Sequence, residues 1–149
     1  MATRPQLLDP RMAAVVIAVV AVGAGVARSR MSDVEVCRRL FQDLAIGSSS
    51  VERRIDWERL TALNADIGSI YRGLPNEQER RRYQQAFVAN FSKSFQQTGA
   101  RPEQFVRWRA EGRTPEQVVV AADYPQKNQA LLLTVPARGK KRLQAIQWK

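Results

Sequence analysis

Apolar side chains recur at steps of three and four residues after Met31, and this spacing predicts amphipathic helices. The first helix begins at Ser32, where the sequence Ser-Asp-Val-Glu has the form of a capping box, and it ends before Gly47. Its apolar face consists of Val34, Cys37, Leu40, Phe41 and Leu44. Such a stripe needs a partner that covers it, so this helix should pack against the rest of the domain.

Two further helices are predicted between Asp56 and Gly99. Asp56 can cap the first of them, which would end near Gly68. Its buried face would consist of Trp57, Leu60, Leu63 and Ile67. Asn76 and Glu79 form another capping signature, for a long helix that ends at Gly99. That helix carries large aromatic side chains at steps of four, which are Tyr83, Phe87, Phe91 and Phe95.

Beyond Gly99 the period of the pattern changes to two, which predicts strands. Four candidate strands lie in the sequences QFVRWRA, EQVVVAADY, NQALLLTV and KRLQAIQWK. The first would direct Val106, Trp108 and Ala110 to one side, and Phe105, Arg107 and Arg109 to the other. The last would direct Ile146 and Trp148 to one face, with a bulge near Leu143. Short connections rich in turn-forming residues predict an antiparallel meander.

Three helices followed by four strands predict an α+β domain over residues 31–149. The helices would bury their apolar faces against a curved four-stranded antiparallel sheet, with the long aromatic helix facing it. Residues 1–30 differ, because residues 12–27 are sixteen uncharged apolar or small residues. We expect a signal peptide or N-terminal membrane anchor there, and a protein that is exported, periplasmic or anchored to the inner membrane. A start at Met31, which would give a cytosolic product, is the alternative.

Twenty-four Lys and Arg against fourteen Asp and Glu give a formal charge of +10, which favours anionic partners such as a membrane surface. The densest basic stretch without an acid contains Arg138, Lys140, Lys141 and Arg142. It is either a charged turn or a surface that contacts anionic headgroups. Arg107, Trp108 and Arg109 alternate basic and aromatic residues, but on a strand the arginines would face away from Trp108. Nucleic-acid binding is therefore disfavoured.

The chain has a single cysteine and no histidine, which argues against an internal disulfide, a zinc site or a Cys/His nucleophile. Cys37 falls on the apolar face of the first helix and is expected to be buried. Asp66 with Tyr71, or Asp123 with Tyr124, could transfer a proton in a pocket, yet both aspartates stand where turns use this residue. We therefore expect a protein that is not an enzyme, with no metal and no cofactor.

Residues 55–123 contain an acidic-aromatic pair, a glycine before an aromatic-Arg turn, a Pro-Glu-Gln-Arg helix start and a strand VVVAADY. The residues are Asp56, Trp57, Gly68, Tyr71, Arg72, Pro75, Glu77, Gln78, Arg80, Phe87 and Phe91. This section resembles the Mla-type (toluene-tolerance) family of periplasmic phospholipid-carrier proteins. The element order is also similar to that of the nuclear-transport-factor-2-like superfamily, whose helices pack into a bent sheet around a pocket. The resemblance implies export, a basic surface and an apolar cavity.

The leading hypothesis is a non-enzymatic binding domain that holds an apolar or amphipathic, lipid-like ligand between helix and sheet. Its candidate lining is Trp57, Tyr71, Phe87, Phe91, Trp108 and Trp148. Each of these aromatic side chains could equally be ordinary core, since large aromatics dominate core packing. The alternative function is a membrane-tethered accessory or structural subunit of a larger complex, which would dock through its sheet or its basic turn.

Overall fold

The chain alternates helices and short strands before it ends in a continuous meander, as seen in a computed structural model that describes residues 31–149. The apolar segment at residues 12–27 lies outside the described residues. The helices are α2 (Asp33–Ile46), α3 (Ile67–Arg72) and α4 (Glu77–Gln97), with short 3-10 turns η1 (Ser49–Arg54), η2 (Pro102–Gln104) and η3 (Pro125–Lys127). The strands are β1 (Thr61–Ala62), β2 (Ala65–Asp66), β3 (Val106–Arg113), β4 (Gln117–Tyr124), β5 (Gln129–Pro136) and β6 (Ala145–Trp148).

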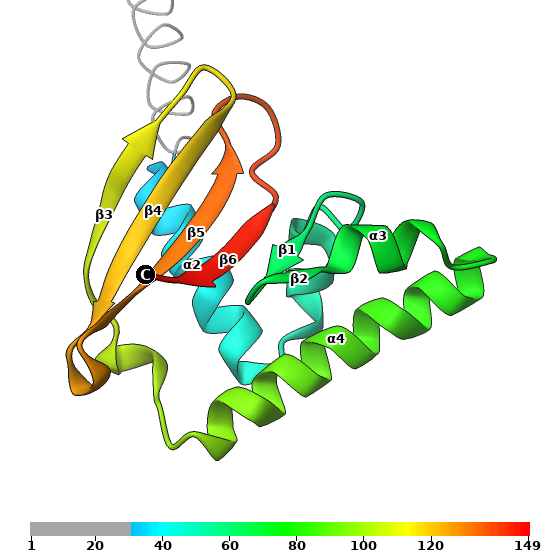
Figure 1. Cartoon of the computed structure of the whole chain (residues 1–149), viewed down its shortest axis with the longest axis horizontal. Helices are drawn as coiled ribbons and strands as arrows, with labels where there is room; N and C mark the ends of the chain where they lie inside the picture. Colours follow the sequence, from blue (N-terminus) through cyan, green and yellow to red (C-terminus); the bar gives the residue numbers. More distant parts are fainter. Residues whose placement is uncertain (1–30) are drawn as a thin grey trace, which may run out of the picture. The chain divides into compact units, whose positions relative to one another are not determined.

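The strands form one mixed sheet of six strands in the order β2-β1-β6-β5-β4-β3 (Figure 1). Strands β3 to β6 are the predicted antiparallel meander, and the α+β class is confirmed. The prediction of four strands was wrong, because β1 adds to β6 in parallel and β2 pairs with β1. No helix within residues 31–149 is both long enough and apolar enough to cross a bilayer.

The helix predicted to follow Asp56 is replaced by the hairpin of β1 and β2. Leu63 and Asn64 join the two strands with positive φ angles of 49° and 72°, as a two-residue hairpin turn requires. The backbone N–H of Leu63 donates to the carbonyl oxygen of Ile146 at 2.9 Å, which ties the hairpin to β6. The spacing of apolar residues after Asp56 is compatible with a helix. In the structure, the backbone groups of this segment instead form hydrogen bonds with β6, which lies far along the chain. Asp66 consequently caps the start of α3, where it accepts from the N–H of Ser69 at 3.0 Å.

The ends of the other two helices follow the local sequence signals. The hydroxyl of Ser32 accepts from the N–H of Glu35, and Gly47 ends α2 with a left-handed φ of 75°. Asn76 caps α4 by accepting from the N–H of Glu79 at 2.9 Å. Both starts and the end of α2 were therefore predicted correctly, because capping depends on residues three or four apart.

The helix that covers the sheet is α2, which contacts β3, β4 and β5, whereas α4 packs against α2 and η1. The sequence had placed α4 against the sheet. Among the residues of α4 only Val88 and Ser92 are fully buried, and the Ser92 hydroxyl donates to the carbonyl oxygen of Ala45 at 2.8 Å. The apolar stripe of α2 is buried from Cys37 onward, at Cys37, Leu40, Phe41 and Leu44, while Val34 is partly buried. Each large side chain on it contributes about 1.5–3 kcal/mol by burial.

The predicted alternation of β3 was wrong at its start. Phe105 is buried and Val106 is 40% exposed, so Val106 does not share a side with Trp108, contrary to the prediction. Arg107 has a positive φ of 54°, and the register with β4 shifts between Val106 and Arg109. This bulge brings Phe105 and Trp108 to the same side, where both rings contact the ring of Phe41, at centroid distances of 4.6 and 5.8 Å.

The last strand, β6, is shorter than the predicted strand KRLQAIQWK. Leu143 lies before β6 and is fully buried, and it forms an isolated parallel bridge with Ile55. Leu143 does not follow the alternation of Ile146 and Trp148 because it pairs with a different segment, the residue that follows η1. Ile146 is fully buried, while Trp148 is 42% exposed at the end of the sheet.

Candidate apolar binding cavity

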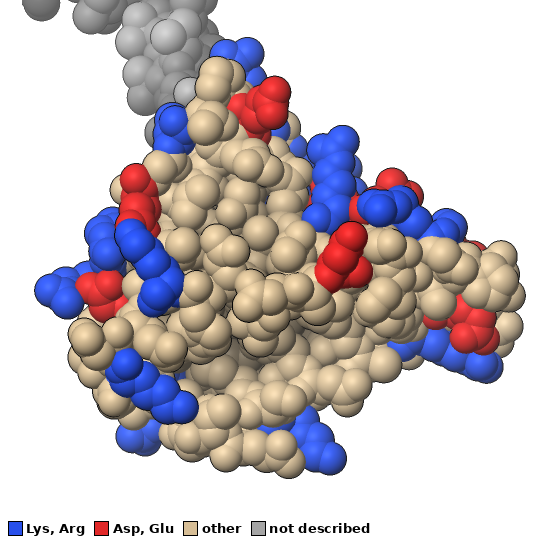
Figure 2. All heavy atoms as spheres, in the orientation of Figure 1, with Lys and Arg blue, Asp and Glu red and all other residues tan. Residues whose placement is uncertain are grey.

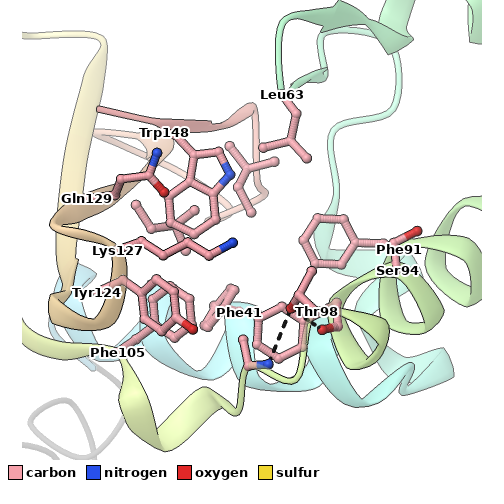
Figure 3. A pocket seen from close by; sticks show the side chains of 14 residues that line it. Phe41, Leu63, Phe91, Ser94, Thr98, Phe105, Tyr124, Lys127, Gln129 and Trp148 are labelled. Atoms are coloured by element: carbon pink, nitrogen blue, oxygen red, sulfur yellow. Dashed lines mark hydrogen bonds between the residues drawn. The ribbon is translucent and has the colours of Figure 1, made fainter.

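An apolar cavity of about 250 Å³ opens between the C-terminal half of α4 and the sheet (Figure 3). Its buried lining consists of Phe41, Ala100, Phe105, Tyr124, Leu131 and Ile146. Its half-buried or exposed lining consists of Leu63, Phe91, Ser94, Phe95, Thr98, Lys127, Gln129 and Trp148. The cavity is therefore apolar at its base, and its few polar groups lie among the more exposed residues.

The base of the cavity is a continuous set of aromatic rings. Phe105 stacks on Tyr124, with ring centroids 4.7 Å apart and planes 9° apart. Trp148 lies beside both rings, at 6.0 Å from Phe105 and 6.2 Å from Tyr124. Phe41 contacts Phe105 from α2, and Phe95 contacts Phe41 from α4 at 5.6 Å in an edge-on arrangement. Each ring is therefore packed against at least one other ring of this wall.

Polar groups around the cavity differ in how far they are already satisfied. The hydroxyl of Thr98 donates to the carbonyl oxygen of Phe95 at 2.6 Å and accepts from the N–H of Ala100 at 3.3 Å. These bonds are the dashed lines of Figure 3. Lys127 extends over the cavity toward Phe91 in the same view. It forms no ion pair with any residue of the described range 31–149.

The six predicted ligand-binding residues fall into three places. Phe91 and Trp148 line the cavity. Trp57, Tyr71 and Phe87 form a second aromatic cluster near α3, with the Trp57 ring 6.0 Å from Tyr71 and 5.4 Å from Phe87. Trp108 packs outside the cavity on Phe41, and its indole N–H donates to the carbonyl oxygen of Phe105 at 3.0 Å.

The polar groups of Trp57 and Tyr71 in the second aromatic cluster are hydrogen-bonded within the protein. The indole N–H of Trp57 donates to the carbonyl oxygen of Glu52 at 2.9 Å, and the Tyr71 hydroxyl accepts from the amide of Gln84 at 3.0 Å. The guanidinium of Arg80 lies over the Tyr71 ring, 5.5 Å from its centroid. This cluster packs α3 against the first half of α4, and Trp57 and Tyr71 also line a polar hollow of their own.

A shallow apolar groove continues from the cavity along α4. It shares Leu63, Phe91 and Ser94 with the cavity and extends past Phe87 to Tyr83. Burial raises the pKa of Tyr83. Figure 2 shows this face of the molecule as a hollowed area with few charged side chains, with both basic and acidic side chains at its edges. An elongated apolar ligand could thus lie along α4 from the cavity.

Most of the predicted basic surface is gathered around a polar hollow of about 370 Å³. Arg138, Lys140 and Arg142 line this hollow together with Arg59, and none of these four forms an ion pair within residues 31–149. The carboxylates of Asp56 and Glu116 line it as well. Lys141 has a different environment, because it pairs with Asp33 at 3.2 Å and donates to the carbonyl oxygen of Pro136 at 2.6 Å. Lys141 therefore ties the β5–β6 connection to the start of α2.

The acid-tyrosine pairs considered for proton transfer do not form paired sites. Asp66 caps α3, whereas Tyr71 lies in the second aromatic cluster. Asp123 binds Arg107 at 2.7 Å and Arg109 at 3.1 Å, while Tyr124 is stacked in the cavity wall. The hydrogen bond from Arg109 and the charges of both arginines lower the pKa of Asp123. Within the described range, no cluster of three or more Cys, Asp and Glu side chains is placed to hold a metal ion.

Sequence reasoning missed most of the lining, including Phe41, Phe105, Tyr124 and Lys127. Phe41 was predicted only as a core residue, and Phe105 was assigned to the opposite side of β3 from Trp108. A usable signal for Lys127 was its place in the Pro-Gln-Lys-Asn turn, which follows Tyr124 directly and must lie at the same end of the sheet.

Comparisons with protein-family models, with curated proteins and with solved structures each found no match for this chain. The functional argument therefore depends on the geometry of the cavity and on the charges around it. Both are properties of residues 31–149.

Proposed function

We propose that this protein is a non-enzymatic binding domain for an amphipathic, lipid-like ligand, whose apolar part occupies the cavity between α4 and the sheet. The observation that carries the proposal is an aromatic cavity with a few polar groups at its open side, which is the usual composition of a small-molecule site. Its volume of about 250 Å³ lies just below the usual range of such sites, which begins at about 300 Å³. One acyl chain suits this space better than the two chains of a phospholipid.

The exposed parts of the lining also favour an apolar occupant. Trp148 is 42% exposed and Leu63 is 47% exposed, and both stand at the same cavity. Covering such surface contributes roughly 25 cal/mol for each Å² removed from water. Because the aromatic wall is already packed, little of this free energy would be lost in ordering side chains.

We further propose that binding takes place outside the cytoplasm, with the protein exported to the periplasm or anchored to the inner membrane. The support is the composition of residues 12–27, which has the length and apolar character of a signal peptide core or a short anchor. Sequencing the amino terminus of the mature protein tests this proposal. A mature chain that begins at Met31 and remains in the cytoplasm would contradict it.

A blocking substitution tests the cavity. Ser94 is exposed on α4 at the point where the cavity meets the groove, so Ser94→Trp should fill the opening without disturbing the core. We expect it to weaken binding of a dansyl-labelled fatty acid to the full-length protein by at least tenfold. Gln97→Trp adds the same ring on α4 at an exposed residue that does not line the cavity, and it should bind as the unmodified protein does.

The unmodified protein, Ser94→Trp and Gln97→Trp all carry the same apolar segment at residues 12–27. Any binding of the fatty acid to that segment is therefore equal in all three and does not affect the comparison. Circular dichroism should first establish that both variants retain the helix and strand content. Equal affinities for the two tryptophan variants would contradict the cavity as the binding site. Mass spectrometry of organic extracts of the purified protein would then identify the natural ligand, and an extract without lipid would count against the proposal.

A second candidate function, docking of a tethered accessory subunit on an anionic membrane surface, is favoured by the polar hollow of Arg59, Arg138, Lys140 and Arg142. Each such cation near an anionic bilayer contributes about 1 kcal/mol. Arg138→Gln with Lys140→Gln should therefore reduce sedimentation of the protein with phosphatidylglycerol vesicles. Lys93→Gln with Arg101→Gln removes the same charge from other exposed positions. Equal losses from both pairs would indicate a net-charge effect and contradict a defined docking surface.

A further inference from the structure

Lys127 is the one charged side chain among the described residues that line the apolar cavity. Other rim groups are hydroxyls and an amide, from Ser94, Thr98 and Gln129. In Figure 3 the Lys127 side chain lies over the aromatic base, with its amine turned toward the cavity and α4. A cation over an apolar cavity is the arrangement expected for an amphiphile whose head group is anionic.

The backbone holds Lys127 in a fixed place relative to the aromatic wall. Pro125 begins the η3 turn immediately after Tyr124, whose ring stacks on Phe105. Asn128 ends the turn in the left-handed region, with φ 50°, and its N–H donates to the carbonyl oxygen of Pro125 at 3.2 Å. This turn therefore places Lys127 at the rim of the cavity, directly after the aromatic wall.

Two acids on the neighbouring strands β3 and β4 already have other partners. Asp123 is bound by both Arg107 and Arg109, and Glu111 pairs with Lys149 at 2.6 Å. Neither carboxylate is left to neutralise Lys127, which forms no ion pair within the described part of the chain. An incoming anion would therefore not have to displace an internal partner.

We propose that the cavity selects single-chain amphiphiles with a carboxylate head group, such as long-chain fatty acids, and that Lys127 binds the carboxylate. This inference depends on the proposed lipid-like ligand and adds its chemical class. A cavity of about 250 Å³ favours one chain. The amine of a lysine is a compact point charge that can hold one carboxylate by a charge-assisted hydrogen bond, and a fatty acid combines one such head group with one chain.

Competition with paired ligands tests the inference on the full-length protein. Palmitate and hexadecanol have chains of similar length but differ in the head group, so palmitate should displace the dansyl-labelled fatty acid at a concentration at least tenfold lower. Lys127→Gln should weaken palmitate binding by about tenfold, the effect of losing one charge-assisted hydrogen bond, and should leave hexadecanol unchanged. Lys127→Arg should retain most of the preference.

Lys93→Gln is the matched control, because Lys93 is exposed on α4 and does not line the cavity. It should change neither affinity. Equal binding of palmitate and hexadecanol, both unaffected by Lys127→Gln, would overturn the inference and leave the apolar cavity standing. A loss for both ligands in Lys127→Gln would also overturn it, since that indicates a structural role. Absence of binding by either ligand to the unmodified protein would overturn the proposed function as well.

Discussion

The ring of Phe105 lies almost parallel to the ring of Tyr124, with 4.7 Å between centroids and 9° between planes. The same Phe105 ring contacts Phe41 on α2 at 4.6 Å, so one side chain joins the cavity wall to the helix that covers the sheet. Binding and stability therefore share residues in this protein. A ligand that fills the cavity would rest on the packing that holds the domain together.

Replacing Phe105 tests this shared role. Phe105→Ala removes a ring that is only 4% exposed and should lower the free energy of unfolding by about 3–5 kcal/mol. Val106→Ala, at the next residue, changes a side chain that is 40% exposed and should cost less than about 1 kcal/mol. Urea unfolding followed by circular dichroism measures both. Equal losses of unfolding free energy in the two variants would show that Phe105 does not connect the cavity wall to α2.

Local signals predicted the helix ends because a cap is decided within one turn. Ser32 and Asn76 each accept from the N–H three residues ahead, which the sequence alone displays. The β1–β2 hairpin could not be found in this way. Its stability comes from pairing with β6, where Leu63 donates to Ile146, and that partner lies far along the chain.

The cavity was harder to predict than the fold because it depends on a bulge. The many aromatic residues indicated a pocket. However, Phe105 and Trp108 lie on the same side only because Arg107 has a positive φ. A strict period of two separates them. Trp57 and Tyr71 lie apart from this cavity, since the hairpin carries that region to a separate cluster near α3.

Gly68 gives a prediction about how α3 is placed. A Cβ atom on this residue would lie 2.4 Å from the carbonyl oxygen of Glu58, and its N–H donates to the carbonyl oxygen of Leu60 at 2.9 Å. Gly68→Ala must therefore push backbone against backbone, and we expect a loss of about 1–3 kcal/mol of stability.

The control for this change is Gly112→Ala in β3. A Cβ there meets nothing within 4 Å, so the substitution should alter stability by no more than about 0.5 kcal/mol. Thermal unfolding of the two variants side by side measures the difference. If the Gly68→Ala protein is as stable as the Gly112→Ala protein, the backbone of α3 does not lie as close to the carbonyl oxygen of Glu58 as described.

Cys37 should be inert in the folded protein. The thiol is fully buried, and burial, followed by the charge of Asp33, raises its pKa to about 12. Ellman's reagent at pH 8 should therefore react only as fast as the protein unfolds, and at once in denaturant. Fast modification of the native protein would contradict the packing of α2 on the sheet.

The same shift makes stability depend on alkaline pH. The thiol ionises near pH 9.0 in the unfolded chain but only near 12 in the folded one, so the folded state binds more protons in between. Stability should thus fall as pH rises above 9, by about 1 kcal/mol at pH 10. Cys37→Ala lacks this component, and its unfolding free energy should decline less between pH 8 and pH 10. Parallel pH profiles for the two proteins would contradict the raised pKa.

Asp123 should have the opposite dependence, on the acid side. The hydrogen bond from Arg109, with the charges of Arg109 and Arg107, lowers its pKa below the ordinary 3.8. A carboxyl with a lowered folded-state pKa stabilises the protein above the unfolded value, and the contribution is lost as pH falls through the folded-state pKa. Because its partner Arg107 forms the bulge, this ion pair also supports the placement of Phe105 and Trp108.

Asp123→Asn should therefore destabilise the protein at pH 7, and the difference from the unmodified protein should shrink as pH falls below 3.8. Denaturant midpoints between pH 2.5 and pH 7 measure this convergence. Glu103→Gln removes a carboxylate that forms no ion pair within residues 31–149 and should leave the profile unchanged. Because the bulge orients Phe105 in the cavity wall, Asp123→Asn should also weaken binding of the dansyl-labelled fatty acid at pH 7. If the stability difference is the same at every pH, Asp123 does not cause the loss of stability at low pH. The bulge would then be supported only by its pairing with β4.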